Sequence, residues 1–374
     1  MEDTSILDKV LSSKQVADIE NFHPSDLLGS LLKHLSSKEE EILRRRFGLQ
    51  NEPKETLEEI GKRYNVTRER VRQIENASIK KLHSLKEFRP LTESTEELIR
   101  QILETHGGAM TDDDLFRELF RSLSPSENEI RSVQFLLHEL FYDKFDRVGK
   151  TQSLENGWKV KTASLTVLHD TIHEIDRAIA EHSSAVTLHD LLELLRGKGF
   201  FQTHPDRLTE EIITSSMELA PNLGHNPYQE YGLASWGTVL PRRMNDKIYL
   251  VLKKHGKPMH FTEITNQINA TGFDKRKAYP PTVHNELILN KQYVLVGRGI
   301  YALKEWGYQP GVVADVLQEI LHRASAPMTR DELVAKVLEQ RIVKKNTIHL
   351  ALADKSRFQK LTDGRYQLAQ QQNT

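Results

Sequence analysis

Four segments of this chain repeat one pattern, and the repeat restricts the fold to an array of small units. The segments read HGGAMTDDDLFREL, HSSAVTLHDLLELL, HGKPMHFTEITNQI and ASAPMTRDELVAKV. Spacings of 76, 73 and 69 residues separate their equivalent positions, Met110, Val186, Met259 and Met328. Each segment lies between two amphipathic helical patterns, and the units close with glycine-aromatic strands such as ENGWKV, GRGIYAL and DGRYQL.

Three helices and a two-stranded ribbon in about seventy residues are typical of a winged helix-turn-helix. A solenoid of bare helix pairs explains the repeated segments but not the closing strands. The fold class that we predict is mainly α with small β wings, a multi-domain array of helix-turn-helix and winged-helix units. The predicted winged units are residues 92–162, 163–241, 244–310 and 311–369.

The composition is that of a soluble protein with a polar surface, with 38% apolar and 28% charged residues. The sequence contains no run of eighteen apolar residues and begins without a signal-peptide pattern, so we expect a cytoplasmic protein that contacts no membrane. It has no cysteine, which excludes disulfides, thiol nucleophiles and cysteine-based zinc fingers.

Positive charge is concentrated in one short stretch. The whole chain has a net charge of −1, but residues 31–90 hold 15 Lys+Arg against 10 Asp+Glu, which gives +5. Between Lys62 and Lys86 there are eight basic and two acidic residues. Such a concentration is typical of a site that binds a polyanion.

The same stretch has the pattern of a helix-turn-helix. After lead-in helices in residues 1–34, Ser36 with Glu39 forms a capping box for a helix that Gly48 ends. Thr56 with Glu59 caps a helix over 57–64, Asn65 is a turn residue, and Thr67 caps a longer helix that extends to about Leu85.

The polar face of that longer helix carries the side chains that read base edges, Arg68, Glu69, Arg72 and Gln73. Arginine donates twice to guanine, glutamine pairs with adenine, and glutamate accepts from cytosine. A solvated surface helix with i,i+4 ion pairs is the alternative. It is disfavoured because Glu69 and Glu75 face a larger number of cations.

The segments LSSKEEEILRRRFGL and TLEEIGKRYNVTRERVRQIENASIKKLHSL resemble region 4 of primary sigma-70 factors, and we assign residues 35–88 to this domain. The resemblance implies that Arg68, Glu69 and Gln73, with Arg72 beside them, read a −35 promoter element in double-stranded DNA. It also implies that Glu39–Phe47 helps to bind the β-subunit flap of core RNA polymerase. The expected phosphate contacts are Arg44, Thr56 and Lys62, to which we add Lys80 and Lys81.

Only about thirty-five residues precede this domain, which is too few for the sigma regions that grip the polymerase and melt DNA. Ala77 stands where the family often has a basic residue that meets activators. We therefore expect one module of a sigma factor.

The third repeat, ending in GIYALKEWG, resembles the HARE-type winged helix-turn-helix. That resemblance implies DNA binding or docking beside polymerase. A possible second DNA contact is formed by Lys275, Arg276 and Lys277, ahead of a helix that starts at proline, and by Arg341, Lys344 and Lys345 in the fourth repeat. A basic surface loop is an equally good interpretation of these clusters.

Patterns typical of catalysis are missing. His169, Asp170 and His173 in HDTIH lack the glutamate base and the third ligand of a zincin, and we find no P-loop or GxSxG motif. We expect no enzyme activity, no metal, no cofactor and no small-molecule substrate. The predicted function is DNA-binding transcription regulation at RNA polymerase. The alternatives are a factor that docks on the β flap without reading DNA, and a DNA-binding adaptor of a restriction or modification system.

Overall fold

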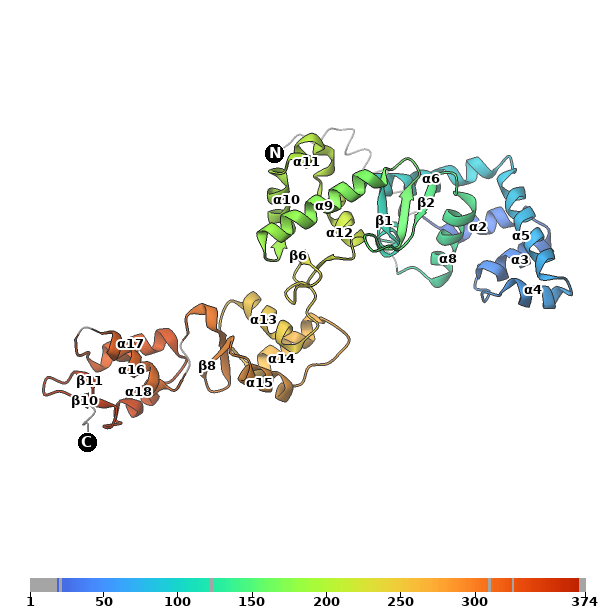
Figure 1. Cartoon of the computed structure of the whole chain (residues 1–374). Helices are drawn as coiled ribbons and strands as arrows, with labels where there is room; N and C mark the ends of the chain where they lie inside the picture. Colours follow the sequence, from blue (N-terminus) through green and yellow to red (C-terminus); the bar gives the residue numbers. More distant parts are fainter. Residues whose placement is uncertain (1–18, 20–21, 122–123, 309–310, 325, 370–374) are drawn as a thin grey trace. The chain divides into compact units, whose positions relative to one another are not determined.

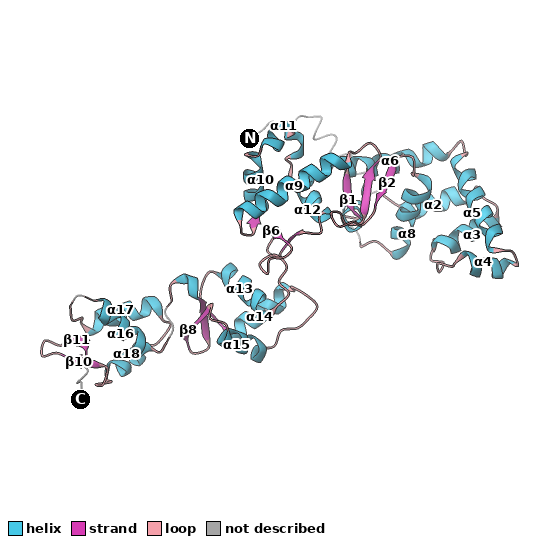
Figure 2. Cartoon of the chain, in the orientation of Figure 1, coloured by secondary structure: helices cyan, strands magenta, loops and turns pink. Residues whose placement is uncertain are grey.

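The computed structural model describes residues 19, 22–121, 124–308, 311–324 and 326–369. Most of the first predicted lead-in helix falls outside the described residues. The rest is mainly helical with small antiparallel sheets, which confirms the predicted fold class (Figure 2). No helix in the described part of the chain combines the length and the apolar character needed to cross a membrane.

The chain divides into two compact units. The first contains residues 1–224 and 231–233, and the second contains residues 225–230 and 234–374. In Figure 1 the first unit is coloured blue to green, and the second is coloured yellow to red.

The predicted helix-turn-helix region contains α3 (Ser37–Phe47), α4 (Leu57–Tyr64) and α5 (Arg68–His83). Helix α2 (Pro24–Leu32) precedes them, in the stretch predicted as lead-in helices. Both predicted capping boxes are confirmed, since the Ser36 and Thr56 hydroxyls accept from the backbone N–H of Glu39 and Glu59. The predicted stop at Gly48 and turn at Asn65 are confirmed as well, because φ is 68° and 52° there and both residues are left-handed helix caps.

The turn between α4 and α5 depends on a close backbone approach at Gly61. The Val66 N–H donates to the Gly61 carbonyl at 2.9 Å. A Cβ atom at residue 61 would lie 2.8 Å from the Val66 carbonyl oxygen, so only glycine fits without movement. Ile42, Ile60 and Val71 form a small buried cluster beneath this turn and join α3, α4 and α5.

The first repeat shares its hydrophobic core with the N-terminal helices. Its elements are α6 (Phe88–Thr105), β1 (Ala109–Thr111), α7 (Asp112–Leu119), α8 (Glu127–Phe135), the π-helical turn η1 (Leu136–Leu140), β2 (Phe145–Val148) and β3 (Gly157–Val160). The three strands form an antiparallel sheet in the order β1-β3-β2. Leu28 and Leu82 of the N-terminal helices lie in the same core as Leu98, Leu115 and Trp158.

The second repeat has the same plan with extra short helices. Its elements are α9 (Leu165–His182), β4 (Val186–Thr187), α10 (Leu188–Arg196), α11 (Gly199–Thr203), η2 (Pro205–Arg207), α12 (Glu210–Leu219), β5 (Leu223–His225) and β6 (Glu230–Leu233). Its strands are ordered β4-β6-β5. The Ser215 hydroxyl on α12 donates to the Ala109 carbonyl of β1 at 2.9 Å, so the first two repeats are packed together.

The second unit holds the last two repeats. The third is built from α13 (Met244–His255), β7 (Met259–His260), α14 (Phe261–Thr271), α15 (Pro280–Leu289), β8 (Tyr293–Gly297), β9 (Ile300–Leu303) and η3 (Lys304–Trp306). The fourth is built from α16 (Val313–Arg323), α17 (Arg330–Gln340), α18 (Lys345–Leu352), β10 (Phe358–Lys360) and β11 (Tyr366–Leu368). The third has a three-stranded sheet ordered β7-β9-β8, and the fourth pairs β10 with β11.

Replacing Gly61 with alanine tests the close approach at the helix-turn-helix. We expect Gly61→Ala to destabilise the α4–α5 pair by roughly 1–3 kcal/mol, because the added methyl group meets a backbone carbonyl that cannot rotate away. Amide hydrogen exchange in α4 and α5 measures this loss directly.

Gly199→Ala is the matched control, since nothing lies within 4 Å of the Cβ position at that helical glycine. Equal protection of α4 and α5 in the Gly61→Ala variant and the wild type would contradict the tight turn.

Candidate nucleic-acid interface

Helix α5 is held by one apolar stripe, and this stripe sets which side chains face outward. Val71 and Leu82 are completely buried, and Ser78 between them donates its hydroxyl to the Ile74 carbonyl at 2.7 Å. Because the helix repeats every 3.6 residues, burying these positions turns the opposite face to solvent. The four side chains expected to read bases, Arg68, Glu69, Arg72 and Gln73, are all exposed.

These four side chains interact mainly with one another and with Arg70. Arg72 donates to both carboxylate oxygens of Glu69, at 2.7 and 2.9 Å, and Arg70 donates to the Gln73 amide oxygen at 3.2 Å. The Arg72 guanidinium lowers the pKa of the Glu69 carboxyl below its usual value. Arg68 forms no hydrogen bond or ion pair within the described residues.

The exposed pair between Arg72 and Glu69 is weakly held, because solvent screens both groups. Each partner can therefore exchange this contact for a base edge. The geometry also adds Arg70, which the sequence analysis did not select. Its contact with Gln73 places a fifth polar side chain at the N-terminal end of the helix, which is the end that a recognition helix presents to bases.

The expected phosphate contacts differ in how free they are. The Lys62 side chain is 77% exposed, and its ammonium forms just a long ion pair, 3.7 Å from the Glu58 carboxylate. Lys80 is exposed without an ion pair to any described residue. Lys81 donates to Glu39 at 3.0 Å, and Arg44 is paired with Glu40.

Thr56 is occupied by its capping role. Its hydroxyl and its backbone N–H both donate to the same Glu59 oxygen, at 2.8 and 2.7 Å. A phosphate oxygen would have to compete with that carboxylate for either donor. Lys62 and Lys80 are therefore the best-placed cations for a DNA backbone.

The other side of the region is covered by α8 of the first repeat. The rings of Phe47 and Phe135 meet edge to face with centroids 4.8 Å apart. Arg131 donates to the carbonyls of Gly48 and Glu52, at 3.1 and 3.4 Å. The C-terminal end of α3, which the resemblance assigns to flap binding, is thus engaged inside the chain.

Helix α5 also touches this repeat. One ring nitrogen of His83 lies 3.0 Å from the Glu139 carbonyl oxygen in η1. Burial raises the pKa of the Glu139 carboxyl, and the nearby negative charge of Glu75 adds to the effect.

The two basic clusters proposed for a second contact lie in different repeats of the second unit. Lys275, Arg276 and Lys277 are exposed in the loop between α14 and α15. Asp274 orders this loop, since it accepts from the buried Lys247 ammonium at 2.6 Å and from the Arg276 N–H at 2.9 Å. The exposed Lys344 and Lys345 lie at the start of α18. The prediction for Arg341 is wrong, because this residue is buried and its guanidinium donates to the carbonyls of Leu295 and Gly311.

Positive and negative charge are separated along the whole chain, and not just in residues 31–90. Residues 91–241 carry 13 basic and 25 acidic side chains, which gives −12. Residues 242–374 carry 22 basic and 12 acidic side chains, which gives +10. This change of charge falls close to the boundary between the two compact units, the second of which contains residues 234–374.

The burial of the Glu139 side chain leads to a prediction about how stability depends on pH. Its folded pKa lies above its unfolded value, so the stability associated with this group is full at low pH and falls as the pH rises through the folded pKa. We expect Glu139→Gln to raise the melting temperature at about pH 7.5 and to change it little at about pH 4. Calorimetry at both pH values measures the difference, and an equal gain at both would contradict it.

The comparisons with known proteins cover the helix-turn-helix region. Residues 31–84 match the family model "Sigma-70, region 4". The sigma factor RpoD of Helicobacter pylori (strain ATCC 700392 / 26695) is 46% identical over 87 residues, 22% of this chain and 13% of the relative. SigA of Lactococcus lactis subsp. cremoris is 47% identical over 64 residues, 17% of this chain and 18% of the relative.

SigA of Clostridium acetobutylicum is 54% identical over 52 residues, 14% of each chain. The chain thus spans less than a fifth of the length of these relatives. Residues 31–84 of this chain are therefore similar to region 4 of sigma-70 factors.

Proposed function

We propose that the chain is a DNA-binding transcription regulator, or sigma-like factor, that acts at RNA polymerase. Its region 4 domain reads a −35-like promoter element in the major groove. Arg68, Glu69, Arg72 and Gln73 contact base edges. Lys62 and Lys80 lead the phosphate contacts, with Arg44, Thr56 and Lys81 in supporting positions.

The observation that carries this proposal is the open polar face of α5. The base-reading set is exposed while the apolar stripe of the same helix is buried. A solvated surface helix would also expose polar side chains, but Glu69 and Glu75 are outnumbered by cations on this helix, which favours a polyanionic partner. The match of residues 31–84 to sigma-70 region 4 supports the same role.

A factor that docks on the β flap without reading DNA is the second candidate. It needs the α3 side of the domain to be open. Phe47 instead packs on Phe135, and Arg131 holds the loop at Gly48, so a partner would have to displace α8. We therefore favour DNA reading, with contact to core polymerase through a surface that α8 leaves uncovered.

We further propose that the repeats are HARE-type winged helices and that the last two assist DNA binding. The +10 charge of residues 242–374 supports this division of labour, with Lys275, Arg276, Lys277, Lys344 and Lys345 as backbone contacts. The segment 91–241 has a net charge of −12, so the phosphate backbone of DNA repels it, and it acts as a spacer. An adaptor for a restriction system would share these features but would show no preference for promoter-like sequence.

Two substitutions separate base reading from phosphate binding. We expect Gln73→Ala to cost roughly 1–3 kcal/mol on a −35-like duplex and to relax base preference, because an adenine contact is lost. We expect Lys62→Ala to weaken all duplexes alike and to reduce the salt slope by about one. Fluorescence anisotropy with the full chain, a −35-like duplex and a shuffled duplex measures both effects over a salt series.

Arg177→Ala is the control, since Arg177 is an arginine on the outer face of α9, about as exposed as Arg72. We expect this substitution to leave DNA binding unchanged. If Gln73→Ala and Arg177→Ala behave alike on both duplexes, the assignment of α5 as the reading helix is wrong.

A further inference from the structure

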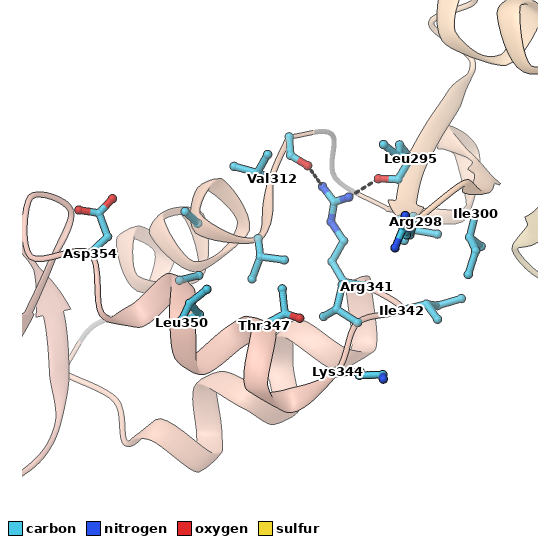
Figure 3. A pocket seen from close by; sticks show the side chains of 17 residues that line it. Leu295, Arg298, Ile300, Val312, Arg341, Ile342, Lys344, Thr347, Leu350 and Asp354 are labelled. Carbon is cyan, nitrogen blue, oxygen red and sulfur yellow. Dashed lines mark hydrogen bonds between the residues drawn. The ribbon is translucent and has the colours of Figure 1, made fainter.

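The second unit contains an open apolar groove between its two repeats. Its volume is about 960 Å³, and its walls come from the β8–β9 wing, the start of α16 and helix α18 (Figure 3). Ten large apolar side chains are exposed on the described residues, and four of them line this groove: Leu295, Val312, Ile342 and Leu350. Exposed apolar side chains that gather in one place mark an interaction site.

The groove is preformed by contacts that join the two repeats. The Ile342 N–H donates to the Val296 carbonyl at 2.9 Å, and the Arg341 guanidinium donates to the carbonyls of Leu295 and Gly311. Figure 3 shows Arg341 between the segment that carries Val312 and the strand that carries Leu295, where its two hydrogen bonds connect the walls of the groove. A Cβ at Gly297 would lie 2.7 Å from the Ile342 carbonyl, so the wing and the loop before α18 are in direct contact.

The rim of the groove is positive. Arg298 and Lys344 line it, and both are exposed without an ion pair to any described residue. Asp354, the acidic residue among the lining side chains, accepts from Ser356 and lies 3.6 Å from Arg357, so the lining carries more cations than carboxylates. An occupant with negative charges beside its apolar side chains therefore complements the groove.

We propose that this groove binds an amphipathic helix of a partner protein, with an apolar stripe in the groove and acidic residues along its flanks. Small molecules fit poorly, because Leu350 is 78% and Val312 62% exposed and would leave most of a small ligand in solvent. Duplex DNA would satisfy the rim cations but has no apolar surface to cover these side chains.

A second copy of this chain also fits poorly among the described residues. The acidic stretch 91–241 exposes only Tyr142 and Leu165 of the large apolar kind, and these are too few to form a stripe. We therefore place the helix on a different protein, and a second copy of this chain is an outcome of the test below. This inference does not depend on base reading by α5.

A synthetic peptide tests the groove on the full chain. The probe is a fluorescent helix of about fifteen residues with leucine at every third or fourth position and glutamate between. Its controls are a shuffled peptide and one with lysine in place of glutamate. We expect saturable binding of the glutamate peptide alone.

Substitutions then locate the site. We expect Leu350→Glu to weaken binding of the glutamate peptide by roughly tenfold or more, because it places a carboxylate in the apolar groove. Leu289→Glu is the matched control, because Leu289 ends α15 outside the groove and is 79% exposed, like Leu350. The double substitution Arg298→Glu with Lys344→Glu should shift preference to the lysine peptide. Unfolding curves check that each variant is folded.

Several results would overturn the proposal. The groove is not the binding site if the shuffled peptide binds as tightly as the glutamate peptide. The same conclusion follows if Leu350→Glu and Leu289→Glu reduce the affinity for the glutamate peptide equally. Displacement of the peptide by a duplex, with Leu350→Glu weakening duplex binding as much as peptide binding, assigns the groove to DNA. Self-association of the chain that Leu350→Glu abolishes assigns it to a second copy.

Discussion

The burial of one stripe of α5 is the constraint on which the account of this protein depends. Val71 and Leu82 are fixed in the core, and the turn at Gly61 sets how α4 approaches the helix. Together they determine which face of α5 remains in solvent, and that face carries Glu69 and Gln73. If this packing changed, the same side chains would still be present but would no longer share one surface.

The packing of α8 against α3 gives the region 4 domain a second property. Because the domain shares its core with the first repeat, α5 is held on a larger body rather than on a short independent domain. The same contact closes the side of α3 at Phe47. One side of the domain is thus open and rich in cations, and the other is used for internal packing, which positions the proposed reading face without a partner.

Local features of the fold could be predicted from the sequence because short-range chemistry determines them. The capping boxes at Ser36 and Thr56 and the left-handed residues Gly48 and Asn65 are examples. The contact between Arg131 and Gly48, and the groove around Arg341, could not be predicted. They join residues from different elements, with no local pattern to mark them. Arg70 was passed over because its role appears only when its contact with Gln73 is seen.

The absence of cysteine from all 374 residues allows a direct test of where α5 lies on DNA. A cleavage reagent attached through Asn76→Cys, on the exposed face of α5, should cut a −35-like duplex at one cluster of positions facing one major groove. The same reagent at Gln134→Cys, an exposed residue of α8, the helix that packs against α2 and α3, should give weaker cuts elsewhere. Uniform cleavage from Asn76→Cys, or cleavage identical to that from Gln134→Cys, would contradict the claim that this helix enters the groove.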